Sequence, residues 1–120
     1  MKALRIIAVF AVAACLLSPA SAHPASKVEL SFDTGTQLLS VDFNHKVKDA
    51  QEHFIYQVQV EINKVTIIEQ SLKSQDDTSR GSLIYRIIDA KPGDEIKVIT
   101  RCNKSGNKAA KLTIEAPSGD

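Results

Sequence analysis

The sequence has few of the side chains that nucleic-acid binders use for stacking. None of its 120 residues is Trp, and aromatic residues make up only 5%. The sequence also has no excess of charge of one sign, because 15 Lys and Arg balance 14 Asp and Glu, for a net charge of +1. Phosphate binding requires clustered positive charge, and bases need aromatic platforms. This composition therefore argues against a nucleic-acid partner.

The chain has two cysteines, too few for a disulfide scaffold. It also lacks a Gly-rich phosphate loop, a Gly-x-Ser-x-Gly elbow and a Cys-x-x-Cys pair. Its 43% hydrophobic and 24% charged residues are typical of one globular domain. A large multi-domain enzyme is excluded by length.

Long apolar runs are absent apart from residues 6–17, which follow Lys2 and Arg5. This run is shorter than the roughly 20 residues of a membrane-spanning helix. The small residues Ala20-Ser21-Ala22 follow it, and they suit a signal peptidase. We therefore predict a signal peptide over 1–22 and a mature domain over 23–120, periplasmic or secreted and without a transmembrane span.

An alternative processing site is Val12-Ala13-Ala14-Cys15, which resembles a lipobox and would anchor a lipoprotein at Cys15. Simple export leaves Cys102 as the single cysteine of the mature chain, so no internal disulfide can form. A lone thiol in an oxidising compartment needs protection. Binding a metal is one way to provide it.

The mature chain reads as strands separated by turn residues. The clearest alternation has Phe54, Tyr56 and Val58 on the inward face of one long strand. Asp33-Thr34-Gly35 copies the triplet of aspartic proteases, but its place between two strands favours a turn. Seven short strands predict an antiparallel immunoglobulin-like β-sandwich. The predicted strands cover residues 28–32, 39–43, 54–62, 65–71, 82–88, 95–102 and 111–116.

The three histidines have a common position in this arrangement. His23 precedes the first strand, His45 follows the second and His53 precedes the third. Cys102 ends the sixth strand, which runs in the same direction as the second. All four side chains should therefore meet at one end of the sandwich. Three imidazoles and a thiolate suit iron, copper or zinc, whereas calcium and magnesium prefer oxygen ligands.

Each of these residues also has an ordinary structural interpretation. Cys102 has the inward phase of its strand and could be a small core residue. His45 continues the inward phase of the second strand and could cap the core edge. His53 is opposite in phase to the Phe54 series and would point outward unless the strand bends at its start. His23 could be a terminal residue without a role.

His53-Phe54-Ile55 at a strand start and Cys102-Asn103-Lys104-Ser105-Gly106 near the C-terminus resemble the iron-binding domain of superoxide reductase, also called desulfoferrodoxin or neelaredoxin. The resemblance implies a seven-stranded sandwich that holds ferrous iron through four His nitrogens and an axial Cys thiolate. It assigns Cys102 as the axial ligand and His53, His45 and His23 as equatorial ligands. Ser105 stands where the fourth family His would be.

The resemblance also implies a function. The protein is expected to bind mononuclear iron, with copper as the alternative, and to reduce superoxide by one electron to hydrogen peroxide with an unidentified electron donor. The Lys beside the first family His has no counterpart here, although Lys46 or Lys48 could act electrostatically. Two other functions stay open, a non-catalytic metal-binding or carrier module and a metal-free immunoglobulin-like interaction domain.

Overall fold

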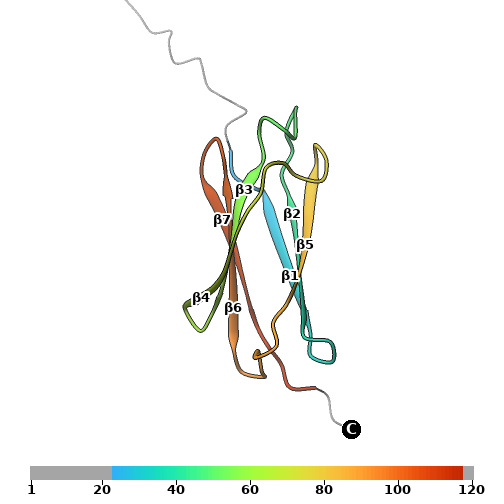
Figure 1. Cartoon of the computed structure of the whole chain (residues 1–120), viewed down its shortest axis with the longest axis vertical. Coiled ribbons are helices and arrows are strands. Elements are labelled where there is room, and N and C mark those ends of the chain that lie inside the picture. The colour runs from blue at the N-terminus through green and yellow to red at the C-terminus, as the bar shows by residue number, and fades with distance from the viewer. Residues whose placement is uncertain (1–22, 118–120) are drawn as a thin grey trace, which may run out of the picture.

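The computed structural model describes residues 23–117, and the predicted signal peptide over 1–22 lies outside the described residues. The described part is all-β (Figure 1). None of its residues forms a helix with the length and apolar character needed to cross a membrane. The strands are β1 (Lys27–Asp33), β2 (Leu38–Asn44), β3 (Ile55–Ile62), β4 (Val65–Ser71), β5 (Arg80–Arg86), β6 (Glu95–Cys102) and β7 (Asn107–Thr113).

The strands form two antiparallel sheets, an arrangement consistent with a β-sandwich. One sheet has the order β1-β2-β5 and the other the order β4-β3-β6-β7. Buried side chains from both sheets form a single core. Seven predicted strands are thus confirmed, as is their antiparallel pairing.

The core follows the predicted alternation along most strands. Alternate residues of β2 and β6 are buried, as a strand with one face toward the core requires. Val58 and Val60 of β3 are fully buried between them. The fully buried aliphatic and aromatic side chains of β2, β3 and β6 are Leu39, Val41, Phe43, Ile55, Val58, Val60, Ile96 and Val98.

The first residues of β3 depart from the expected alternation. Ile55 pairs with Cys102 and Gln57 with Arg101, so Tyr56 is an extra residue in a β-bulge. Ile55 is consequently buried, while Tyr56 is 39% exposed. The prediction that Tyr56 lies in the core is therefore wrong. The bulge reverses the phase of the residues before it.

The boundaries of two strands, β5 and β7, also differ from the sequence prediction. β5 begins at Arg80 and ends at Arg86, and β7 begins at Asn107. Gly106 has a φ of 81°, which allows the chain to reverse directly after β6. The Cys102 N–H donates to the Gly106 carbonyl across this turn, at 3.0 Å. β7 thus starts earlier than its apolar residues suggest.

The Asp33-Thr34-Gly35 triplet forms a turn, as predicted. The Asp33 carboxylate accepts hydrogen bonds from the backbone N–H groups of Gly35, at 2.8 Å, and Thr36, at 3.3 Å. This is the local hydrogen bonding for which Asp is favoured in turns. Asp33 is exposed, and its carboxylate accepts these hydrogen bonds within its own turn.

Candidate metal centre

His45 lies just beyond the end of β2 and continues its inward phase. The side chain has no solvent exposure. Its backbone N–H donates to the Ser79 carbonyl at 2.9 Å, which holds this position against the segment before β5. The alternation of β2 and one backbone hydrogen bond are therefore enough to turn the imidazole inward.

His53 precedes β3 and is also buried, with 6% exposure. Its backbone N–H donates to the Asp49 carbonyl at 3.0 Å, closing a tight turn. Because Tyr56 is the bulged residue, His53 shares the phase of buried Ile55 rather than that of exposed Tyr56. The bend that an inward His53 requires is thus supplied by the bulge.

Asn103 fastens the start of β3 to the end of β6. Its side-chain carbonyl accepts from the Phe54 N–H at 2.9 Å, and its backbone N–H donates to the Phe54 carbonyl at 3.0 Å. Its amide group also donates to the Glu52 carbonyl at 3.0 Å. These three bonds bring His53 beside Cys102, whose Sγ lies 3.1 Å from His53 Nε2.

His23 completes the cluster from the N-terminal end of the described chain. The residues that follow His23 are held by the burial of Ala25 and by a 2.9 Å hydrogen bond from the Ser26 N–H to the Asn44 carbonyl. The ring nitrogen Nδ1 of His23 lies 2.9 Å from the Pro24 carbonyl. Because a carbonyl only accepts, Nδ1 carries a proton and the ring presents Nε2 as its free nitrogen.

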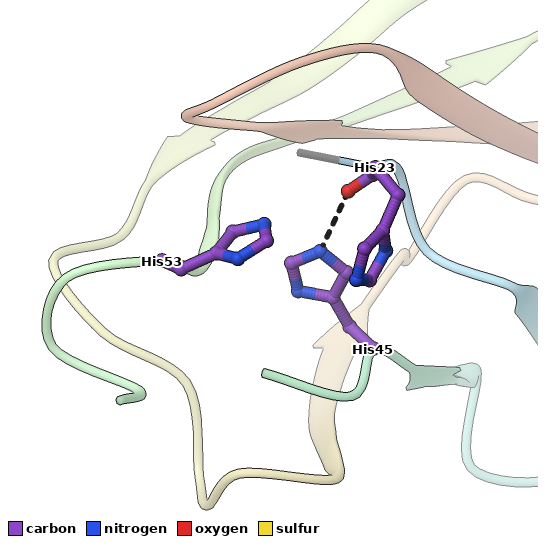
Figure 2. A group of neighbouring side chains, drawn as sticks. All are labelled: His23, His45 and His53. Atoms are coloured by element: carbon purple, nitrogen blue, oxygen red, sulfur yellow. Dashed lines mark hydrogen bonds between the residues drawn. The ribbon is translucent and has the colours of Figure 1, made fainter. Parts of the chain in front are cut away.

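The three imidazoles lie next to one another (Figure 2). One potential ligand nitrogen from each ring lies within 4.8 Å of the others. The ring centroids are 5.0 Å apart for His23 and His45, 5.1 Å for His23 and His53, and 4.7 Å for His45 and His53. The predicted meeting of the histidines is confirmed as a geometric arrangement.

This spacing fits one transition-metal ion after a small contraction. Nitrogens that bind one ion at about 2.1 Å can be at most about 4.2 Å apart. A nitrogen and a sulfur at right angles on one ion, with bonds of about 2.1 and 2.3 Å, would be about 3.1 Å apart. The His53–Cys102 separation of 3.1 Å has this value. The three imidazoles could therefore hold an ion after a small contraction, with Cys102 beside them at His53.

Cys102 contacts the histidine cluster through His53. Its buried thiol also accepts a hydrogen bond from the Lys104 N–H at 3.3 Å. The thiolate is the form of a cysteine that binds metals. Ser105, three residues beyond Cys102, is exposed on the turn before β7.

Burial lowers the pKa of His53 below its ordinary value of 6.5, and nearby charge on His45 and His23 lowers it further. Burial disfavours the charged form of an imidazole, and so do neighbouring cations. The neutral ring, which is the form that binds metals, is consequently favoured at neutral pH.

Gln75 is the residue of this site that sequence reasoning missed. It lies in the segment between β4 and β5, which is otherwise exposed around it, yet Gln75 itself is only 8% exposed. Its Oε1 lies 2.8 Å from Nδ1 of His45. No periodicity marks a buried residue in such a polar segment, so the sequence carries no signal for it.

Comparison with known proteins does not assign this chain to a family. No family model matches it, and a search of curated proteins finds no match either.

Proposed function

We propose that this protein is an exported iron-binding protein of the superoxide reductase type. The observation that carries the proposal is the His53–Cys102 pair, 3.1 Å apart, beside two further imidazoles. A buried thiol next to three convergent histidines is a donor set suited to iron, with copper as the alternative. Calcium and magnesium prefer oxygen ligands, whereas these donors are nitrogen and sulfur.

The strand order supports an immunoglobulin-like sandwich as the finer fold. The first, second and fifth strands share one sheet, and the third, sixth and seventh share the other. The fourth strand pairs with the third, so it has moved to the second sheet relative to the constant-type immunoglobulin order. Export through a signal peptide over 1–22 completes the proposal, with the mature domain periplasmic or secreted.

Bound iron would supply one electron, which with two protons converts superoxide to hydrogen peroxide. The protein's own residues would hold the metal and set its electronic character. His23, His45 and His53 would bind as neutral imidazoles, and the Cys102 thiolate would donate electron density. The Lys104 N–H that donates to Sγ would moderate this donation.

Anaerobic loading of the chain that begins at His23 with iron(II) tests the proposal. We expect about one iron per chain, and consumption of superoxide without release of dioxygen. His53→Gln, which removes one central ligand, is the matched control and should lose both properties. A protein that binds no metal would instead be an interaction domain.

A non-catalytic metal carrier is the second candidate. It is favoured by Ser105, which is exposed and offers only a hydroxyl where the family resemblance places a fourth His. Bound iron without superoxide consumption would support the carrier. Ser105→His should then strengthen iron binding if the turn before β7 lies where the family's does.

A further inference from the structure

The side chain of Gln75 sits at the junction of three segments. Its Nε2 group donates to the carbonyls of His45, at 2.8 Å, and Asp77, at 3.0 Å. Its Oε1 accepts from the Ile55 N–H at 3.3 Å and lies 2.8 Å from Nδ1 of His45. Gln75 thus connects the end of β2, the start of β3 and the segment that precedes β5.

These partners allow only one orientation of the amide. Two carbonyl oxygens require the NH₂ group on one side, and the Ile55 N–H requires the oxygen on the other. Reversing the amide would direct its oxygen at two carbonyls and its NH₂ group at an N–H. Buried groups left without partners in this way cost free energy, so the reversed orientation is disfavoured.

The fixed amide also determines that Nδ1 of His45 carries a proton. Oε1 is an acceptor, so Nδ1 must be the donor of the 2.8 Å contact. The other nitrogen, Nε2, lies 3.0 Å from the His23 carbonyl (dashed line in Figure 2). This carbonyl is also an acceptor, so Nε2 shares a proton with it in the metal-free protein. Because Gln75 keeps the proton on Nδ1, Nε2 is the nitrogen that can lose its proton and its contact with the His23 carbonyl to a metal.

The geometry points to Gln75 as a positioning residue of the metal centre, which holds His45 with Nδ1 protonated and thereby commits Nε2 to the ion. This inference rests on the proposed function for its metal and on the hydrogen bonds of Gln75 for its mechanism. Partners that orient a metal-bound histidine through its second nitrogen typically contribute about 10- to 100-fold to metal affinity. Gln75 would do so as a neutral amide, and it would couple the site to the segment before β5.

Two measurements on the chain that begins at His23 test the inference. Long-range ¹H–¹⁵N NMR spectra of the imidazoles should show His45 protonated at Nδ1 in the metal-free protein and bound through Nε2 in the zinc-loaded protein. Gln75→Leu should lower the affinity for cobalt(II) by about 10- to 100-fold and release the His45 ring into a mixture of tautomers.

Gln70→Leu is the matched control. Gln70 is also partly buried and accepts one hydrogen bond, from the Tyr85 hydroxyl at 2.7 Å, but it lies on β4 outside the cluster. It should lose some thermal stability while keeping the cobalt affinity and the His45 tautomer of the parent. Equal losses of cobalt affinity in Gln75→Leu and Gln70→Leu would mean that Gln75 has only a general structural role.

The spectrum of the unsubstituted protein decides the inference even if Gln75→Leu fails to fold. His45 protonated at Nε2 alone, or bound to zinc through Nδ1, would overturn it. If the parent binds neither cobalt nor zinc, the proposed metal site fails, while the tautomer of His45 in the metal-free protein still decides the role of Gln75.

Discussion

Nε2 of His53 lies 3.1 Å from Sγ of Cys102. His53 precedes β3 and Cys102 ends β6, and the antiparallel pairing of these strands brings the start of one beside the end of the other. Alternation along β6 turns Cys102 inward, but alternation along β3 alone would turn His53 outward. The bulge at Tyr56 turns His53 inward, and Asn103 holds the two strand ends together. The contact is the part of the site most open to direct test.

Replacing Cys102 by Ser tests whether the thiolate binds the metal. The iron-loaded, oxidised parent should show a visible thiolate-to-ferric charge-transfer band, and Cys102→Ser should lack it. Ser is close to Cys in size, so the folded sheets should persist in far-UV circular dichroism. A variant with the spectrum of the parent would remove Cys102 from the ligand set.

Val58 and Tyr56 test the bulge as a matched pair. Val58 is fully buried, so Val58→Asp would bury an unpaired charge at a cost of several kcal/mol and unfold a domain of ordinary stability. Tyr56→Asp changes a side chain that is 39% exposed and should cost roughly 1 kcal/mol. Urea denaturation measures both, and similar losses would mean that the phase of β3 is misassigned.

Gly81 is required by the ring of Phe43. A methyl group at position 81 of β5 would overlap this ring, which is held at the centre of the core. Gly81→Ala should therefore lower the free energy of unfolding by about 1–3 kcal/mol. Gly35→Ala, where the new methyl group meets only the exposed Asp33 carboxylate, is the control and should cost about 0.5 kcal/mol.

The stability of the metal-free protein should fall as pH falls through the unfolded-state pKa of His53. Burial, with charge on His45, His23 and Lys104, holds the folded-state pKa of His53 below 6.5. Below this pH the unfolded chain binds more protons than the folded chain, so acid favours unfolding. The hydrogen bond from Asn63 lowers the pKa of Asp94 below 3.8, so Asp94 contributes a separate loss in stronger acid.

Thermal melting at about pH 7.5 and about pH 5.5 isolates the histidine contribution, because ordinary carboxylates titrate below about pH 4.5. His53→Gln keeps a polar side chain of similar length without the titration. It should show a smaller loss between the two pH values than the parent. An equal loss would assign the effect to other groups.

The sequence by itself determined the strands, their antiparallel order and the end of the protein at which His23, His45, His53 and Cys102 meet. Side-chain alternation and turn residues are local properties, and reversal at each turn fixes the end that each residue occupies. Burial of His45 and Cys102 followed directly from the phase of β2 and β6.

Only the tertiary structure decided the orientation of His53, the exposure of Tyr56 and the burial of Gln75. A bulge arises from the pairing of two strands, so the sequence of β3 alone does not contain its position. Gln75 is buried because the end of β2 and the start of β3, both distant from it in sequence, offer it hydrogen-bond partners together with its own segment. Such partners exist only once the sheets have packed, and a polar segment gives no local pattern from which to predict them.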